Sequence, residues 1–461
     1  MKVLLTHGYF LAEDAVEQTI MKPYPPLGIL YISAYLDEAQ IDHAVFDTTF
    51  TTTDQWKAHI NREQPDLIAF YVNLMTKVKI IQLMNYVQSN ENLNHTKIVL
   101  GGPDITYNQE AYLNAGADFL IIGEGEQTTL ELIQHLEEAT SLENIDGLCF
   151  RKSNQLIQNP ARTKIKDLDE LPLPNRHLFP IETYLDTWKK AHGKSALNIS
   201  TQRGCPYTCK WCSTAVYGQS YRRRSPQKVV EELHVLMQTY QPDTFWFVDD
   251  VFTVSHKWMR GFAQEIKKSG LKIQYECITR AERMNEEIIQ LLKETGCFRV
   301  WIGAESGSQK IIDAMDRRVD VNLVKNQLIA TKKAGIETGT FIMVGYPGET
   351  YEDILETAAY LEAAQPDHFT ITKSYPIKGT SLYQEIESDI TEAPDWNTST
   401  DREIEFKRTY PPAFYQAAIR YIHNRVHLQR KDNHWFDRLK MTLKVKLSDR
   451  SMQKWVKSKR L

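Results

Sequence analysis

Three cysteines fall within eight positions of this chain, in the segment Arg203-Gly204-Cys205-Pro206-Tyr207-Thr208-Cys209-Lys210-Trp211-Cys212. Thiolates are the usual ligands of iron–sulfur clusters, and this C-x-x-x-C-x-x-C spacing lets one tight loop bind three irons of a cubane cluster. A structural zinc site would need a fourth Cys or His close by, and none follows within a short reach. Cys205, Cys209 and Cys212 are therefore predicted to hold a [4Fe-4S] cluster whose fourth iron is open to a ligand.

Further candidate residues follow apolar, strand-like runs in the second half of the chain. They are Asp249 and Asp250, Arg280, Glu305 in the segment 303–307, and Gly345 and Gly348 in the segment 345–349. A carboxylate that lacks a partner is costly to bury, and an arginine can form a charge-assisted pair with an acidic ligand. Each of these segments alone is also typical of an ordinary turn. Their order and spacing favour ligand contacts because they resemble those of the enzyme family named below.

The cysteine triplet, with aromatic Trp211 directly before the third cysteine, resembles that of the radical S-adenosylmethionine (SAM) superfamily. In that family the open iron chelates the amino and carboxylate groups of SAM, and an electron from the cluster releases methionine and a 5'-deoxyadenosyl radical. The resemblance implies that Trp211 packs near the adenine. It also implies roles near the SAM amino end for Asp249 or Asp250, at the SAM carboxylate for Arg280, near the ribose or amino group for Glu305, and beside the adenine for Gly345 and Gly348.

The first 140 residues alternate between strand-like and helix-like runs. These runs are 2–6, 27–39, 43–47, 66–72, 79–89, 97–100, 119–122 and 127–138. Such alternation predicts an α/β fold with a parallel sheet that is doubly wound, with helices on both faces. Ligands of such sheets bind in the loops at the carboxyl ends of the strands.

Three glycine-containing segments of this region resemble the cobalamin-binding domain that precedes the radical SAM core in one large class of enzymes. They are Pro25-Pro26-Leu27-Gly28-Ile29-Leu30-Tyr31, Leu100-Gly101-Gly102-Pro103 and Ile122-Gly123-Glu124-Gly125-Glu126. Gly28, Gly101, Gly102, Gly123 and Gly125 would let the backbone approach a corrin and its nucleotide tail. The D-x-H-x-x-G string that supplies a lower axial His in many such domains is missing, so we expect a cobalt without a His lower ligand. The alternative is a domain that has kept this fold and lost the ligand.

From residue 196 the alternation resumes with a longer period. Apolar strand-like runs at 196–201, 244–249, 272–279, 299–304, 338–344 and 368–374 alternate with helical patterns at 226–240, 256–268, 285–295, 323–334 and 352–364. Six successive β/α units predict a partial (β/α)6 barrel. The predicted domains are thus a cobalamin-binding domain at 1–140, a proline-containing linker at 141–193, a radical SAM core at 194–390 and a basic helical extension at 391–461.

The resemblance implies a cobalamin-dependent radical SAM enzyme, and methyl transfer to an unactivated carbon is the commonest chemistry of this class. One SAM would methylate the cobalamin, and a second would supply the radical that removes a substrate hydrogen. The main alternative is oxidative cyclisation of the kind performed by anaerobic magnesium-protoporphyrin IX monomethyl ester cyclases. Methylthiotransferases carry further cluster cysteines in their first domain, and no cysteine precedes Cys149 here. An iron–sulfur sensor is a minor alternative, because a sensor needs neither the SAM-facing strand ends nor a second cofactor.

The amino-acid composition and the net charge limit the classes of partner that the chain is expected to bind. With 461 residues, 42% hydrophobic and 25% charged residues and a formal charge of -4, the chain is expected to be a folded protein that does not bind nucleic acid. A small-molecule substrate, or one of the lipid or tetrapyrrole class, and a low-potential electron donor such as flavodoxin or ferredoxin are expected partners. The sequence contains neither a signal-peptide pattern nor a long apolar run, which predicts a cytoplasmic location.

The C-terminal tail, from Arg430 to Leu461, combines many basic residues with interleaved Trp and Leu residues. Such a segment can bind peripherally to an anionic membrane surface, which would make the protein membrane-associated. In the alternative interpretation, the apolar residues of the tail pack on the barrel and its lysines form a solvated face.

Overall fold

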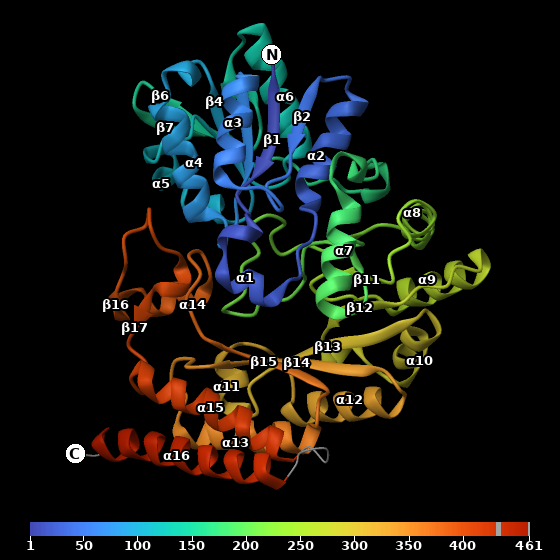
Figure 1. Ribbon diagram of the computed structural model, residues 1–461, viewed down its shortest axis with the longest axis vertical. Coiled ribbons are helices and arrows are strands. Elements are labelled where there is room, and N and C mark those ends of the chain that lie inside the picture. Colours follow the sequence, from blue (N-terminus) through green and yellow to red (C-terminus); the bar gives the residue numbers. More distant parts are fainter. Residues whose placement is uncertain (430–434, 460–461) are drawn as a thin grey trace. The chain divides into compact units, whose positions relative to one another are not determined.

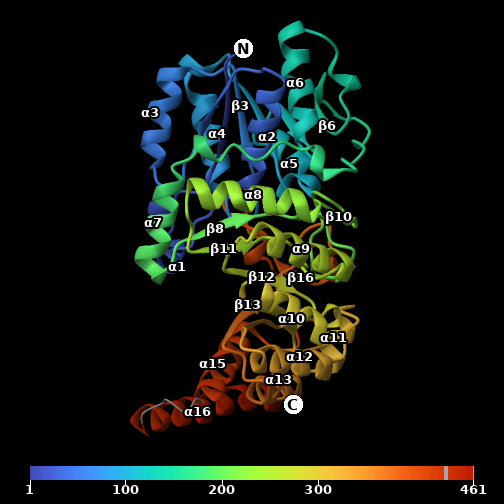
Figure 2. The same ribbon diagram turned by 90° about the vertical axis from the view of Figure 1, so that its right-hand side faces the viewer.

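The computed structural model of the chain describes residues 1–429 and 435–459; Arg430 of the predicted tail therefore lies outside the described residues. Two compact units make up the chain (Figures 1 and 2). Unit 1 comprises Met1–Pro206, Ser213–Phe245 and Ala393–Glu403. Unit 2 comprises Tyr207–Cys212, Trp246–Glu392 and Ile404–Leu461.

Unit 1 is built on a seven-stranded sheet with the order β2-β1-β3-β4-β5-β6-β7. Its strands are β1 Val3–His7, β2 His43–Phe46, β3 Leu67–Tyr71, β4 Lys97–Gly101, β5 Phe119–Ile121, β6 Leu148–Lys152 and β7 Gln155–Gln158. The first five are parallel, whereas β6 and β7 are added antiparallel at one edge. The helices are α1 Ala15–Ile20, α2 Leu27–Glu38, α3 Thr53–Glu63, α4 Lys77–Ser89, α5 Gln109–Asn114, α6 Glu126–Glu138 and α7 Ile181–His192.

Side chains alternate between two hydrophobic cores along each strand of this sheet, because successive strand residues point to opposite faces. Leu4 packs with residues of α3, α4 and α5, whereas Val3 and Leu5 pack with residues of α2 and α6. The two cores cover both faces of the sheet and confirm the doubly wound arrangement. The helix α3 was not predicted, because only Trp56 and Ile60 of its residues are buried and the helical pattern is correspondingly weak.

The segment 141–193, predicted as a linker, contains β6, β7 and α7. Its two strands are only five and four residues long, and β7 has no fully buried residue. Runs this short carry too little alternation to be recognised from the sequence. The segment therefore adds two strands, β6 and β7, at one edge of the sheet of unit 1, and β7 is its edge strand.

The second large sheet has six strands in the order β15-β14-β13-β12-β11-β8. They are β8 Ala196–Ile199, β11 Thr244–Phe247, β12 Tyr275–Thr279, β13 Cys297–Glu305, β14 Glu337–Val344 and β15 His368–Lys373. The intervening helices are α8 Pro226–Thr239, α9 His256–Ser269, α10 Glu286–Glu294, α11 Gln309–Ala314, α12 Val321–Lys333 and α13 Tyr351–Ala364. Each strand lies beside the next one along the chain, and the pairings among β12, β13, β14 and β15 are parallel. This open sheet of β/α units confirms the predicted partial barrel.

The C-terminal part of unit 2 is largely helical. It contains α14 Ser381–Ile386, a short antiparallel pair of β16 Ile390–Glu392 with β17 Glu405–Phe406, and the helices α15 Pro412–Leu428 and α16 Trp435–Lys459. Among the described residues, no helix is both long and apolar enough to cross a lipid bilayer.

Candidate active site

The cysteine loop begins just after a glycine that no other residue could replace without strain. Gly204 has a φ of +84°, and a Cβ there would lie 2.4 Å from the carbonyl O of Ser220. Just before it, β9 Gln202–Arg203 pairs antiparallel with β10 Arg222–Arg223. The chain that carries the cysteines is therefore closed at its base by a two-stranded ladder.

The three cysteines of the triplet all lie on this loop and reach the surface to different extents. Cys205 and Cys209 are half-buried and Cys212 is exposed, whereas Cys149, Cys277 and Cys297 are buried. Cys205 is part of unit 1, and Cys209 and Cys212 are part of unit 2. Within residues 1–429 and 435–459, no three His, Cys, Asp or Glu side chains are grouped closely enough to hold a metal ion. The assignment of the triplet as cluster ligands thus stays a prediction from its spacing.

Arg280 at the end of β12 lies beside the middle cysteine. Its Nη1 is 3.2 Å from Cys209 Sγ, and its guanidinium stacks 3.9 Å from the ring centroid of Tyr207. Its Nε donates to Glu282, and its Nη2 donates to the carbonyl O of Arg317 at 2.5 Å. The side chain is nearly buried, so these partners fix the position of the positive charge. The role of Arg280 at the SAM carboxylate stays a prediction.

Trp211 and the 345–349 turn, both predicted to lie near the adenine, are brought together in unit 2. Trp211 packs against a hydrophobic cluster that contains Tyr346, Ile311 and Met315. The two glycines of the turn have left-handed backbone, with φ of +81° at Gly345 and +80° at Gly348. A Cβ at Gly348 would meet no described atom within 4 Å, so the backbone there is open to a ligand.

Glu305 is in a strained conformation at the end of β13. Its φ is +65°, which is uncommon for a residue other than glycine, and the register of β13 against β14 shifts at this point. Such strain and such bulges concentrate at functional sites. Desolvation raises the pKa of the Glu305 carboxyl to about 7, and the nearby Arg317 and Arg280 oppose this rise. Near neutral pH this carboxyl would therefore readily lose its proton when a cationic ligand approaches.

The two aspartates that follow β11 differ in environment. Asp249 is buried, and Asp250 is exposed. Although Asp250 reaches solvent, partial burial of its carboxyl and the neighbouring Asp249 raise its pKa. The role of Asp249 or Asp250 near the amino end of SAM stays a prediction.

Of the five glycines predicted to approach cobalamin, Gly102, Gly123 and Gly125 lie in loops at the carboxyl edge of the sheet, Gly101 ends β4, and Gly28 is in the first turn of α2. Gly102 has a φ of +121°, and a Cβ there would lie 2.2 Å from the carbonyl O of Val72, so the loops after β3 and β4 approach closely. A Cβ at Gly101 would meet nothing within 4 Å, and Gly123 has a φ of +91°. Gly101 therefore leaves open space beside a tightly packed pair of loops, as a flat ligand would need.

A buried ion-pair group in unit 1 was not recognised from the sequence. Arg203, directly before the cysteine loop, donates to Glu124 at 2.9 Å and to Glu126. Arg222 also binds Glu124, at 2.8 Å. The side chains of Arg203, Glu124 and Glu126 are at most 8% exposed. The only sequence signal was the presence of two glutamates in the glycine-containing segment 122–126, and their partner could not be identified from it.

The comparisons with known proteins agree with this architecture. Residues 199–361 match the model of the radical SAM superfamily, and residues 15–133 match that of the B12 binding domain. An uncharacterized methyltransferase of Pyrococcus horikoshii is 29% identical over 393 residues, which cover 83% of each chain. The anaerobic magnesium-protoporphyrin IX monomethyl ester cyclase of Rubrivivax gelatinosus is 25% identical over 398 residues, covering 84% of this chain and 70% of the cyclase.

A solved structure shares the fold over nearly the whole chain. The cobalamin-dependent SAM radical enzyme OxsB, with aqua-cobalamin bound, superimposes with a TM-score of 0.77 at 15% identity, covering 99% of this chain and 80% of OxsB. The chain belongs to the cobalamin-binding radical SAM enzymes. Its cofactors are a [4Fe-4S] cluster, SAM and cobalamin.

The residues of this radical SAM enzyme fit these cofactors in their chemistry. Three thiols on one loop are the donor set of an open-site cluster. The open backbone at Gly101 and Gly348 leaves room beside the strand ends where cobalamin and SAM are expected. We therefore regard the strand ends of unit 2, with Cys209 and Cys212, as one candidate site and the carboxyl edge of the sheet in unit 1 as another.

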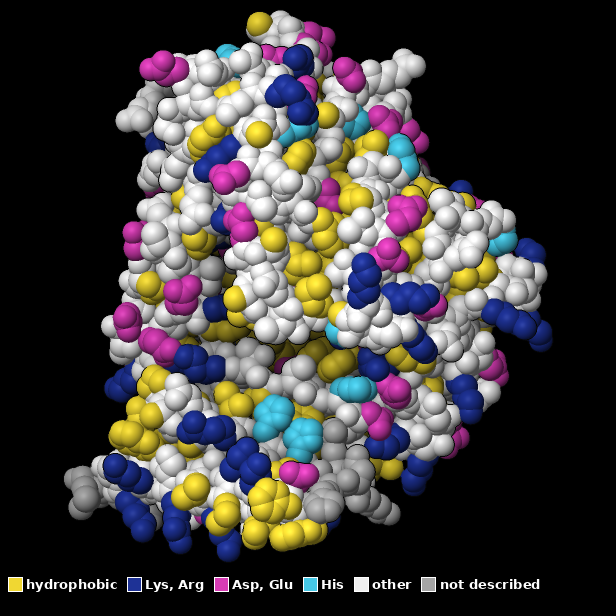
Figure 3. All heavy atoms as spheres, viewed as in Figure 1, with side chains coloured by type: hydrophobic (Ala, Val, Ile, Leu, Met, Phe, Trp, Pro, Cys, Tyr) yellow, Lys and Arg dark blue, Asp and Glu magenta, His cyan; other side chains and the backbone are white. Residues whose placement is uncertain are grey.

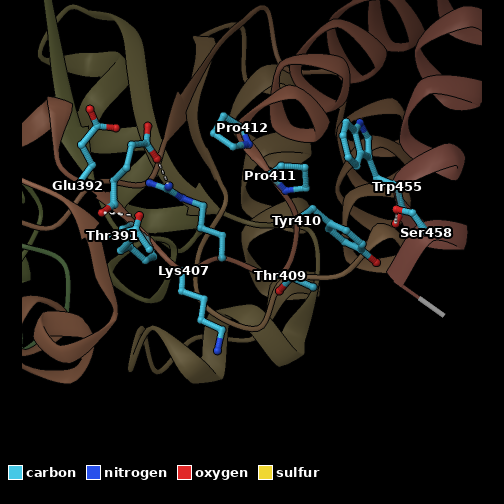
Figure 4. Close-up of a pocket in the computed structure, with 12 residues that line it drawn as sticks. Thr391, Glu392, Lys407, Thr409, Tyr410, Pro411, Pro412, Trp455 and Ser458 are labelled. Carbon is cyan, nitrogen blue, oxygen red and sulfur yellow. Dashed lines mark hydrogen bonds and ion pairs between the residues drawn. The ribbon is translucent and has the colours of Figure 1, made fainter. Parts of the chain in front are cut away.

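A surface pocket of about 560 Å³ in unit 2 of this enzyme lies apart from those residues in the sequence (Figure 4). Residues of β16, β17, the start of α15 and the end of α16 line it. Two of its charged groups are already paired: Glu405 binds both Lys373 and Arg408, and Arg408 Nη2 also donates to the carbonyl O of Ser374 at 2.8 Å. We therefore assign no ligand to this pocket.

Proposed function

We propose that this enzyme is a cobalamin-dependent radical SAM methyltransferase that methylates an unactivated carbon. The observation that carries the proposal is the pairing of a cobalamin-binding domain with a radical SAM domain in one chain, together with the 29% identity to a protein named as a methyltransferase. When bound, the cluster supplies the electron that cleaves SAM, and cobalamin supplies the methyl carrier. The substrate would be a small molecule or a lipid or tetrapyrrole.

In this proposal Cys205, Cys209 and Cys212 bind the cluster. The contact of Arg280 with Cys209 supports it, because a cation beside a thiolate favours the ionised sulfur that binds iron. One electron must enter the cluster for each SAM that is cleaved to a radical. A low-potential one-electron donor such as flavodoxin or ferredoxin is the proposed partner for this step.

The chain's own residues would orient SAM in unit 2. Trp211 and Tyr346 provide an apolar surface that suits an adenine ring, and the open backbone at Gly348 lies in the same turn as Tyr346. Glu305 provides a carboxyl whose negative form would be stabilised by a cationic ligand. These contacts would hold SAM in one orientation.

We also propose that the cobalt has no His lower ligand. The imidazole of His7, at the end of β1, is buried and is bonded through Nε2 to Asp47 at 2.9 Å and through Nδ1 to the Thr48 hydroxyl at 3.0 Å. Both ring nitrogens are thus already engaged. Electron paramagnetic resonance of the cob(II)alamin state tests the proposal, since hyperfine splitting from an axial nitrogen would contradict it.

A reaction without substrate tests the methyltransferase assignment. The holoenzyme would be reduced under anaerobic conditions and incubated with methyl-labelled SAM. Label in the cobalamin fraction and an equal amount of S-adenosylhomocysteine are expected. Labelled SAM cleaved only to 5'-deoxyadenosine, with none of the label on cobalamin, would contradict methyl transfer.

Oxidative cyclisation is the second candidate, and the cyclase of Rubrivivax gelatinosus supports it, with a match that covers 84% of this chain. A cyclase would release 5'-deoxyadenosine with its true substrate and would incorporate no methyl group. In the reaction without substrate, a cyclase would therefore place no methyl label on cobalamin, whereas a methyltransferase would. This difference distinguishes the two candidates before the substrate is known.

A further inference from the structure

The C-terminal helix α16 has one face packed on the rest of unit 2. It contacts α15 and α13. Met452 and Ser448 on this face are buried, and Met441 and Val445 are half-buried. The residues 441, 445, 448 and 452 recur every three or four positions, so they form one stripe of the helix. This stripe is the face of α16 that packs on the rest of unit 2.

A second apolar stripe lies on the opposite face of α16 and points to solvent. Leu439 is 52% exposed, Leu443 54% and Leu447 62%. At 100° per residue, this stripe is about half a turn away from the packed one. Figure 3 shows hydrophobic side chains next to Lys and Arg side chains along the lower edge of the molecule, where Figure 1 places α16. The alternative interpretation from the sequence, in which these leucines pack on the barrel, is wrong.

Basic residues line both sides of the leucine stripe, which we define as Leu439, Leu443 and Leu447. Lys440 and Lys444 lie on one side of it, and Lys446 and Arg450 lie on the other; all four are exposed. The acids of α16 are few, and one of them, Asp449, is bonded to Tyr351 at 2.5 Å. The solvent-facing side of α16 is therefore apolar along its middle and positively charged along both margins.

We propose that this face docks α16 on an anionic lipid surface, with the helix parallel to the bilayer plane. Leucines would enter the boundary between headgroups and acyl chains, and the flanking ammonium and guanidinium groups would bind lipid phosphates. A second copy of the chain fits this face less well, because pairing two such helices would bring their basic margins together.

Vesicle co-sedimentation of the full-length protein tests the proposal. Vesicles of phosphatidylcholine with phosphatidylglycerol are compared with vesicles of phosphatidylcholine alone. At low salt the protein is expected to pellet with the anionic vesicles, and salt that shortens the screening length should release it. Retention in the supernatant with anionic vesicles at low salt would overturn the proposal, and so would equal binding to both kinds of vesicle.

Three variants identify the responsible residues. The triple variants L439S/L443S/L447S and K440Q/K444Q/K446Q should each lower the partition coefficient on anionic vesicles by tenfold or more. The matched control V16S/I20S/V235S removes three apolar side chains that are 65%, 41% and 45% exposed elsewhere, and should bind as the wild type does. Every changed residue is at the surface, and circular dichroism checks that each variant is folded.

Two results would contradict the assignment of the leucine stripe. The first is unchanged vesicle binding by the folded leucine variant. The second is a dimer in sedimentation velocity that the leucine variant abolishes, together with no vesicle binding by the wild type; this result would assign the stripe to self-association. Neither measurement depends on methyl transfer, so the docking proposal and the proposed function can fail separately.

Discussion

Arg280 Nη1 lies 3.2 Å from Cys209 Sγ, so a buried guanidinium donates a hydrogen bond to the middle cysteine of the triplet. Glu282, the carbonyl O of Arg317 and the ring of Tyr207 hold the guanidinium in place. A fixed positive charge next to a cluster ligand stabilises the more negative, reduced state of the cluster. In the proposed enzyme, Arg280 would therefore act on the cluster through Cys209.

Replacing Arg280 with Gln is predicted to make the cluster harder to reduce. The lost charge should lower the reduction potential, measured without SAM, by on the order of 50 mV, which for one electron corresponds to roughly tenfold in the equilibrium constant. Iron content should stay the same. The control is R283Q, since Arg283 bonds to the hydroxyl of Tyr207. Equal potentials in R280Q and the wild type would show that Arg280 does not tune the cluster.

Replacing Cys205, Cys209 and Cys212 together with Ala is predicted to remove the cluster and leave a folded chain. The three side chains are half-buried or exposed, so little apolar burial is lost. Iron content and the visible absorbance of the reconstituted protein are the measurements. The control is C149A, which removes a fully buried thiol and should keep the iron. A triple variant that still carries a full complement of iron would refute the ligand assignment.

Replacing Arg203 with Met is predicted to destabilise unit 1 by about 3 kcal/mol, because it leaves buried carboxylates without their cation. Glu124 keeps Arg222 as a partner in this variant. The destabilisation should therefore come mainly from the lost ion pair with Glu126. The double variant R203M/E126Q should therefore be more stable than R203M in urea denaturation. If the double variant is the less stable of the two, the ion pair is not the cause of the loss.

The pH dependence of stability is predicted to involve Glu349. Its carboxyl is buried, Oε2 accepts the Gly345 N–H at 2.5 Å, and desolvation raises its pKa to about 8. Between the ordinary pKa of about 4.5 and this raised value, the folded protein holds a proton that the unfolded chain has lost. This contribution to stability is full below the lower value and is lost as the pH rises through the higher one.

In the variant E349Q, the decrease in stability with rising pH that comes from this carboxyl should be absent. The free energy of unfolding of the variant, relative to the wild type, should rise between about pH 5 and pH 8 by on the order of 3 kcal/mol. Urea denaturation of both proteins across this range is the measurement. A difference between the two proteins that does not change with pH would rule out an ionisation of Glu349 in this range.

The sequence predicted the fold well and the side-chain partners poorly. Strand runs such as 338–344 are long and apolar, so local pattern alone located β14 to within one residue. By contrast, the bond between Arg203 and Glu126 joins residues 77 positions apart, and no local pattern pairs them. The strain at Glu305 was equally hidden, because a bulge depends on the register of two strands. The exposure of Leu439, Leu443 and Leu447 required knowing which face of α16 is packed.

The most direct test of the central claim is an anaerobic turnover of the reduced holoenzyme with methyl-labelled SAM and candidate substrates. S-adenosylhomocysteine, 5'-deoxyadenosine and the product mass would be followed together. We predict a labelled, methylated product that forms with one S-adenosylhomocysteine and one 5'-deoxyadenosine. A product that forms with 5'-deoxyadenosine alone and carries no label would contradict the methyltransferase assignment.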